Sequence, residues 1–343
     1  MRHLNMMYAI EVLSSKLNGS SDTVEEKKAE FDNVSYVKKI DGRGVVSAPC
    51  QKYNIQRFMQ EAENMPIGKR LKKGTKVTIS ADPYKYVNED IFGFMRADSI
   101  SITEEEYDQL DAESKVLFTR DSKKGYKQNI TKKRKSRFQL SPLINMSNRK
   151  IDTEWNICST ESDSMPYENE IYSGIFAAIG NVNIDDISSF KISDITSEFR
   201  DYAVEEGRTE KELKISKNEK YKRIESAIKG LQHLSIEGNQ NNYLTDTTPK
   251  IVMLGEYSWG NNIFQGVIKE NGIDIDALKE ALDENEEFRK SDVWIGISDK
   301  IVDPQYKGVK KTLTDKLEDY KFVHVDSVKN TFDEYLKYLK NTL

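Results

Sequence analysis

A dense group of cationic side chains lies before the middle of this 343-residue chain. Five of the six residues from 132 to 137 are basic, namely Lys132, Lys133, Arg134, Lys135 and Arg137. Lysine and arginine at this density attract phosphate groups whatever the nucleotide sequence. Many basic runs, however, only face water. The run therefore predicts either a polyanion-binding segment or a solvated loop.

A second group combines glycine, arginine and the start of a helix. The turn Asp41-Gly42-Arg43-Gly44 precedes a helix for which Ser47 is the expected N-cap and Pro49 lies in the first turn. Glycines beside Arg43 allow backbone N–H groups to approach a phosphate, and a helix N-terminus favours negative charge. The alternative is an ordinary strand–turn–helix connection.

A third group is rich in amides and begins with a glycine. It comprises Gly238, Asn239, Gln240 and Asn241 and is followed by Asn242 and Tyr243. Amide and backbone N–H groups suit phosphate, ribose and base edges. Asparagine also favours the left-handed conformation of polar turns, so a structural turn is the alternative.

The motifs of common enzymes and metal sites are absent from the sequence. It contains no P-loop, GxSxG, GxGxxG, CxxC or HExxH motif, and its three histidines are scattered. We therefore expect no catalytic residue, no metal and no cofactor. Cys50 and Cys158 are isolated and indicate reduced thiols in the cytoplasm. No apolar run reaches the ~18–20 residues that span a bilayer, so we expect no membrane contact.

Charge is distributed unevenly along the chain. The net charge is -5, yet residues 34–80 hold ten Lys/Arg against three Asp/Glu, and residues 121–137 hold eight against one. From residue 270 to the end there are twelve Lys/Arg against seventeen Asp/Glu. This asymmetry predicts one surface that faces a polyanion and another that faces solvent or a neighbouring subunit.

These groups need a scaffold, and the hydrophobic pattern predicts a strand–helix–strand–strand–helix–strand order. The expected elements are Met6–Leu13, Ser47–Glu61, Phe138–Ile144, Ile171–Ile179, Glu219–Leu231 and Ile251–Gly255. A short strand is expected at 34–40, an acidic helix at 102–117 and a last helix at Val328–Leu339. The order is that of an RRM-like or ferredoxin-like α+β fold.

The segment 151–165 lacks strand periodicity and lies between two expected strands. It nevertheless carries Trp155, Ile157 and Met165 among polar neighbours. Exposed apolar side chains gain nothing in water, so wedging between bases or docking on another copy of the chain would explain them. The alternative is that Trp155 folds back onto the core.

Four segments together resemble the DevR-type backbone subunits of type I CRISPR Cascade complexes, in the Cas-seven family of the RAMP superfamily. They are Val45–Ala48 at the start of the first helix, the block Asn88-Glu89-Asp90-Ile91-Phe92-Gly93-Phe94-Met95, residues 166–174 with 181–184, and the loop 238–241. They occur in the family's order over most of residues 6–255. The family's loop often carries a lysine where this loop has only amides.

The resemblance implies a hand-like protein with an RRM/ferredoxin-like palm, a large inserted fingers region and a protruding thumb hairpin. The palm would comprise residues 1–60, a strand at 132–149, and residues 168–343 with a helical C-terminal part. The fingers would be residues 61–131 and the thumb 150–167. The subtype implied is I-B.

The resemblance also implies a function, which is non-catalytic binding of a guide RNA (crRNA). Copies of the chain would form a helical filament along the spacer, pair the guide with target DNA in antiviral defence, and contact other Cascade subunits. RNA contacts would fall on the basic run, on the amide loop, on Ser47, and on Lys38, Lys39, Arg43, Lys52, Arg57, Lys222 and Arg223, with Met165 as a wedge. A RAMP-type endoribonuclease that cuts guide or target RNA remains the alternative.

Overall fold

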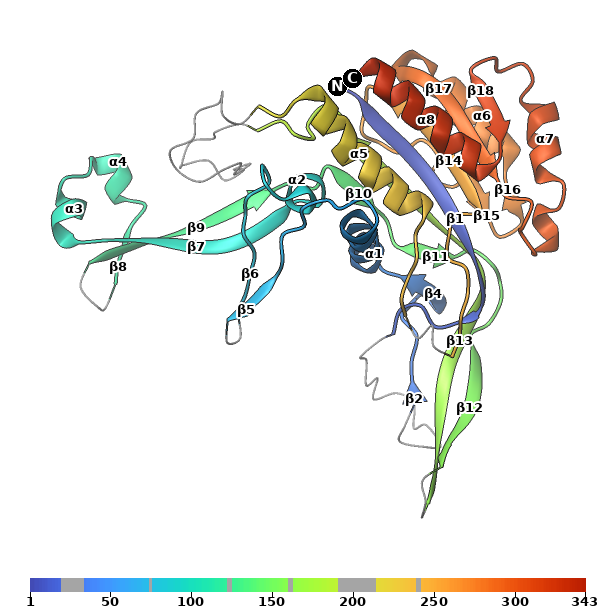
Figure 1. Cartoon of the computed structure of the whole chain (residues 1–343), viewed down its shortest axis with the longest axis horizontal. Coiled ribbons are helices and arrows are strands. Elements are labelled where there is room, and N and C mark those ends of the chain that lie inside the picture. Colours follow the sequence, from blue (N-terminus) through green and yellow to red (C-terminus); the bar gives the residue numbers. More distant parts are fainter. Residues whose placement is uncertain (20–33, 74–75, 122–124, 160–162, 191–213, 239–241) are drawn as a thin grey trace. The chain divides into compact units, whose positions relative to one another are not determined.

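The chain folds into two compact units (Figure 1). The computed structural model describes residues 1–19, 34–73, 76–121, 125–159, 163–190, 214–238 and 242–343. The first unit comprises Met1–Met65, Phe138–Asp185 and Lys217–Leu343, and the second comprises Pro66–Arg137 and Asp186–Ser216. No described helix is long and apolar enough to cross a membrane.

A mostly antiparallel sheet forms the centre of the first unit, with the strand order β18-β17-β14-β1-β13-β11-β4-β3. The bounds are β1 His3–Ser15, β3 Lys39–Ile40, β4 Arg43–Val46, β11 Leu143–Asn145, β13 Ser164–Asn183, β14 Ile251–Tyr257, β17 Arg289–Ile297 and β18 Val323–Asp326. Helix α1 (Ala48–Glu61) lies between β1 and β11 in the chain, and α5 (Lys217–Gln232) lies between β13 and β14. The strand–helix order expected from the sequence is therefore present.

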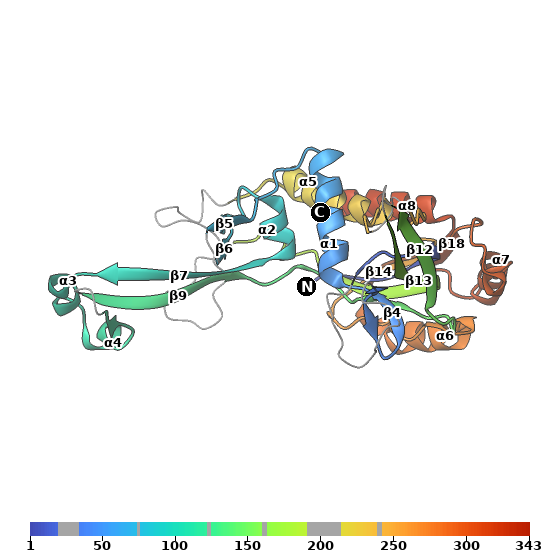
Figure 2. The ribbon, with the colours of Figure 1, turned by 90° about the horizontal axis from the view of Figure 1, so that it is seen from below.

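Helices lie on both faces of the sheet (Figure 2), and alternate side chains of its strands pack into these two layers. On one face, Met7, Ala9 and Met253 pack with the apolar residues of α6 (Ile275–Glu284) and α7 (Val309–Lys316). On the other face, the hydroxyl of Tyr8 bonds to Gln51 of α1, and α8 (Val328–Thr342) packs on β17 and β14. Residues i and i+1 of a strand point to opposite faces, so β1 contributes to both layers.

The segment expected to be the thumb forms an antiparallel hairpin, although its sequence lacks strand periodicity. Strand β12 (Asp152–Ser159) pairs in antiparallel register with the outer part of β13, from Asp152 opposite Ile171 to Ser159 opposite Ser164. β2 (Val34–Ser35) adds a parallel strand at the base of this hairpin. Both faces of the two-stranded part lie in water, so no alternation of polar and apolar residues marked the strand.

Two further expectations need correction. The strand expected at 138–144 is divided into β10 (Phe138–Leu140) and β11, because Pro142 has no N–H for the ladder. The Ser141 hydroxyl accepts a hydrogen bond from the backbone of Ile179 at 2.9 Å instead. The strand expected at 34–40 is likewise divided into β2 and β3. The remaining elements of this unit are β15 Ile268–Lys269, β16 Gly272–Ile273 and two 3-10 turns, Glu286–Phe288 and Pro304–Tyr306.

The second unit is built on a long hairpin. Strands β7 (Phe94–Ile102) and β9 (Tyr126–Arg134) pair throughout, and β8 (Thr119–Arg120) adds a short third strand. The other elements are β5 Leu71–Lys73, β6 Lys76–Thr78, α2 Val87–Phe92, α3 Glu104–Asp108 and α4 Ala112–Lys115. The helix expected at 102–117 is therefore two short helices, because Thr103 and Asp111 each cap a separate start.

Candidate nucleic-acid interface

The open sheet face on which RRM domains stack bases is covered in this chain. Met7, Ala9, Ile175 and Ala177 of β1 and β13 lie in the core beneath α6 and α7 and are at most 7% exposed. Stacking of bases requires exposed aromatic faces. This face of the sheet is therefore not available for stacking bases.

The β3–β4 hairpin brings three of the predicted cationic residues to the sheet edge. Asp41 and Gly42 both have positive φ, as a two-residue hairpin turn requires. Arg43 is exposed and Lys38 is half-buried. Lys39 is ion-paired with Glu170, so its charge is largely neutralised and Arg43 is the better phosphate ligand.

The first turn of α1 follows directly after β4. Ser47 is the N-cap residue, as predicted, but its hydroxyl makes no capping hydrogen bond. Its own backbone N–H is bonded to the Asn18 side chain at 3.0 Å. The first turn contains no acidic residue. A helix N-terminus without a capping carboxylate favours an anion, although Pro49 contributes no N–H group here.

The cationic residues further along α1 have different surroundings. Burial lowers the pKa of Lys52. Lys38 lies near Cys50 and partly offsets the burial that raises the pKa of that thiol. Arg57 forms ion pairs with Glu237 and, at 3.8 Å, with Glu61. Arg57 is therefore fitted to fasten α1 to the segment after α5.

The amide loop begins against the end of β1. A Cβ atom at Gly238 would lie 2.5 Å from the carbonyl oxygens of both Lys16 and Leu17, so only glycine fits there. Asn239, Gln240 and Asn241 lie outside the described residues. On the preceding helix, Lys222 is exposed, whereas Arg223 is 4% exposed and pairs with Glu219 at 3.3 Å.

Tyr243, which follows the amide loop in the chain, binds the base of the thumb hairpin, a role the sequence did not reveal. Its hydroxyl donates to Glu154 of β12 and accepts from Asn169 of β13 at 3.1 Å and from Asn156 at 3.5 Å. Burial, followed by the hydrogen bond to Glu154, raises the pKa of Tyr243. Tyr243 is therefore hydrogen-bonded to both strands at the base of the hairpin.

Replacing Tyr243 by phenylalanine should loosen the thumb base. The buried amide of Asn169 loses its acceptor, so we expect unfolding to become easier by about 1–2 kcal/mol and hydrogen exchange in β12 to accelerate. Tyr53→Phe is the control, because Tyr53 is 65% exposed on α1. Urea denaturation with hydrogen-exchange mass spectrometry measures both effects. Equal behaviour of the two variants would refute the role of Tyr243.

The apolar side chains of the thumb divide between its two faces. Residues opposite each other in an antiparallel pair share a face, and Ile157 is paired with Pro166 while Cys158 is paired with Met165. Trp155 and Ile157 therefore lie on one face and Met165 on the other. Trp155, Ile157 and Met165 are 54%, 68% and 52% exposed. Trp155 thus does not fold back into the core.

The basic run belongs to the second unit and ends strand β9, where Lys132 and Lys133 pair with Arg96 and Met95. Arg134 is 3% exposed and Arg137 is 7% exposed, whereas Lys135 is exposed. Burial leaves Arg134 and Arg137 unsuited to phosphate contact, whereas Lys133 is half-buried and Lys135 faces solvent.

Asp90 explains the burial of Arg134. Its carboxylate accepts hydrogen bonds from the Arg134 guanidinium at 2.5 Å and from the backbone N–H of Ser188 at 3.1 Å. The side chains of Asp90 and Arg134 are both fully buried. Phe190 covers the guanidinium, with 4.9 Å between the Arg134 carbon and the ring centroid. Within the block 88–95 that carried the family resemblance, the aspartate therefore holds the second unit together.

Among the described residues, no three His, Cys, Asp or Glu side chains gather as a metal site would require. His233, near the amide loop, stacks on Phe58 with ring centroids 5.3 Å apart.

Comparison with known proteins gives a family and a fold. Residues 36–251 match the sequence model of the family described as CRISPR-associated negative auto-regulator DevR/Csa2. No curated protein matches. A solved chain titled "CRISPR RNA-guided surveillance complex" is 10% identical with a TM-score of 0.50, covering 98% of this chain and 99% of its own. A second, titled "CRISPR RNA-guided surveillance complex, pre-nicking", is 10% identical with a TM-score of 0.55, covering 98% and 100%.

At such low identity the solved structures show a shared fold, and the sequence match shows the family. It extends over more than half of the chain and includes β3, β4, α1, the Asp90 block, the thumb and the amide loop. This chain belongs to the CRISPR-associated DevR/Csa2 family.

Proposed function

We propose that this chain is a guide-RNA-binding backbone subunit of a CRISPR type I effector, of subtype I-B, that acts without catalysis of its own in the cytoplasm. Copies would line up along the spacer of the crRNA, and the guide would then pair with target DNA while the protein holds backbone shape. The first unit would be the RRM-like palm, the second the fingers, and β12 with the outer part of β13 the thumb. Neighbouring copies and other Cascade subunits are the proposed protein partners.

The observation that carries this proposal is the sheet edge formed by β3, β4 and the start of α1. Exposed Arg43 and half-buried Lys38 lie beside a helix N-terminus without an acidic residue or a side-chain cap. Such a surface binds the phosphate backbone and does not read bases. That is the chemistry required of a subunit that must accept any spacer sequence.

The salt dependence of RNA affinity tests this assignment. For single strands, log Kd changes with log salt by about 0.7 per phosphate neutralised. The variant Lys38→Gln/Arg43→Gln should therefore lower the slope by about 1.4 and weaken binding equally for unrelated spacer sequences. Fluorescence anisotropy with labelled guide-length RNA over a salt series measures both quantities.

A matched control removes two charges elsewhere in the same unit. Lys300 and Lys311 are exposed in the acidic C-terminal part, so Lys300→Gln/Lys311→Gln should leave the slope unchanged. A flat salt response of the unmodified protein, or equal slopes for the two double variants, would move the interface away from this edge.

Cleavage of RNA is the alternative activity. Incubating the protein with guide and complementary RNA, with and without magnesium, separates the two functions. We expect intact RNA under both conditions, and a magnesium-dependent product would favour the endoribonuclease.

A further inference from the structure

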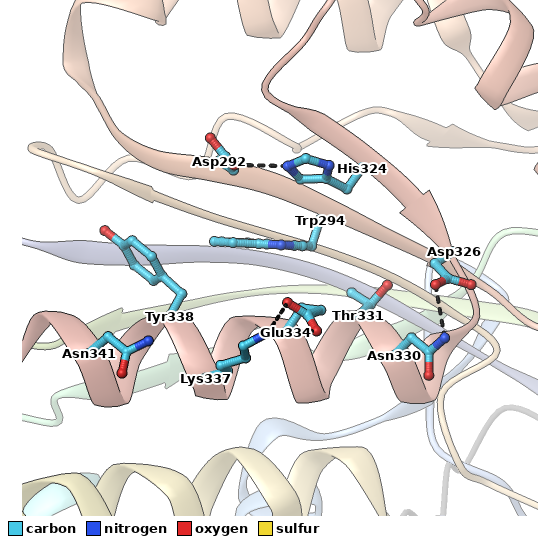
Figure 3. A pocket seen from close by; sticks show the side chains of 10 residues that line it. All are labelled: Asp292, Trp294, His324, Asp326, Asn330, Thr331, Glu334, Lys337, Tyr338 and Asn341. Atoms are coloured by element: carbon cyan, nitrogen blue, oxygen red, sulfur yellow. Dashed lines mark hydrogen bonds and ion pairs between the residues drawn. The ribbon is translucent and has the colours of Figure 1, made fainter.

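A polar pocket of about 490 Å³ lies between α8 and the two end strands of the sheet, β17 and β18 (Figure 3). Its floor comes from alternate residues of the parallel strands, because Trp294 is paired with His324 and Gly296 with Asp326. Its wall is a stripe of α8 at helical spacing that includes Thr331, Glu334 and Tyr338. No other described strand pairs with β18, so a chain can approach the pocket along this edge.

The pocket carries excess negative charge. Asp292, Asp326 and Glu334 line it against one lysine, Lys337. Asp292 is 2.8 Å from the His324 ring nitrogen, and Glu334 is 3.5 Å from Lys337. The side-chain amide of Asn330 is the main cause of a lowered pKa at Asp326. Like charges repel, so this site disfavours RNA and attracts a cation.

Two further features of the pocket favour a planar cation that can stack on an aromatic ring and donate hydrogen bonds. Trp294 and Tyr338 present neighbouring rings, with centroids 5.3 Å apart and planes inclined at 49°. Further along α8, at the other end of Trp294 from Tyr338 (Figure 3), the Thr331 hydroxyl is buried without a hydrogen-bond partner, on a residue that is 2% exposed. A buried hydroxyl normally has a hydrogen-bond partner. A ligand with an N–H group could supply that partner to Thr331.

Tyr338 already lies close to one guanidinium group of this chain. The Arg2 carbon lies 5.9 Å from the centre of the Tyr338 ring. Arg2 also donates to both oxygens of Glu256, at 2.7 and 3.1 Å. Guanidinium groups combine stacking on rings with paired hydrogen bonds, which an ammonium group cannot do.

We propose that this pocket binds the guanidinium of an arginine that a partner protein presents in an extended segment. The carboxylates of Asp292 and Glu334 attract the cation, the Tyr338 ring stacks against its plane beside Trp294, and its N–H groups have the Thr331 hydroxyl as a further acceptor. The site lies on the acidic C-terminal part and is independent of the proposed RNA-binding edge.

The test uses the full-length, nitrogen-15-labelled protein and a blocked tripeptide with a central arginine. The indole N–H signal of Trp294, identified by its loss in Trp294→Phe, should shift with peptide concentration. A tripeptide with citrulline, which has the same shape without the charge, should cause at most a small shift. In the variant Asp292→Asn/Glu334→Gln, the affinity should fall about fivefold or more, since two partly exposed carboxylates are lost.

The control variant Asp299→Asn/Glu318→Gln changes the same charge at exposed positions outside the pocket and should bind as the parent does. All four altered carboxylates are exposed, so the fold should persist and circular dichroism checks this. An unmoved Trp294 signal, an equal response to citrulline, or equal affinities of the two double variants would each overturn the proposal.

Discussion

Shortening the thumb should abolish regular assembly on guide RNA while leaving the folded chain nearly as stable as before. Trp155 and Glu168 lie directly opposite each other in the β12–β13 register. Residues 156–167 can therefore be replaced by a two-residue Asn-Gly turn, which closes antiparallel strands without strain. The melting temperature should change by only a few degrees, because the removed Ile157 and Met165 are 68% and 52% exposed. Electron microscopy of the protein with guide RNA measures assembly.

The two faces of the thumb allow a sharper version of this experiment. Ile157→Ser changes the face shared with Pro166, and Met165→Ser changes the face shared with Cys158. A wedge between bases or a contact with the next copy uses one face more than the other, so we expect one substitution to impair assembly far more. Regular, full-length filaments of the shortened protein would show that the thumb is not required.

Removing the carboxylate of Asp90 should be the most destabilising single change in the second unit. Asp90→Ala leaves the Arg134 guanidinium buried without its counter-ion, and both side chains are fully buried. Loss of one partner of a buried ion pair costs about 3–5 kcal/mol. Hydrogen-exchange mass spectrometry should show faster exchange in α2 and β9, and urea denaturation should show an earlier transition.

An exposed pair in the same unit provides the control. Arg120 and Glu104 are 2.7 Å apart, with side chains that are 74% and 59% exposed. Glu104→Gln should therefore cost less than about 1 kcal/mol, because water screens such pairs. If Asp90→Ala destabilised the protein no more than Glu104→Gln, the buried pair would not hold the unit together.

The central elements could be predicted because their signals are local. All seven residues of β14 are buried and apolar or small except Glu256, so the strand is visible as a continuous run. Ser47 and Pro49 mark the start of α1 in the same way. The bounds of β13 and β12 were less predictable, because a ribbon solvated on both faces has no buried side to impose a period of two.

The site residues depended on partners far away in the sequence. Arg134 resembles any other member of the basic run until Asp90, forty-four positions earlier, is known to face it. Tyr243 looks like the end of a polar loop, although its hydroxyl binds Asn169, seventy-four positions earlier. Charge density therefore indicated a polyanion surface, but only the fold separates arginines that bind protein from those that face solvent.

Strand β13 runs without a break from the central sheet into the thumb, so a change within the sheet is transmitted to the thumb tip. One strand of twenty residues runs from the sheet core to the hairpin, a length of ~66 Å at ~3.3 Å per residue. Gly174 lies midway along it, has φ +138°, and an added Cβ there would lie 2.5 Å from the Ser147 hydroxyl. Because the outer arm from Ser164 spans ~33 Å, a rotation of ~10° at that point would carry the tip through ~6 Å. A small change in torsion at this one crowded, buried glycine would thus move side chains at the thumb tip, about ten residues away along the strand.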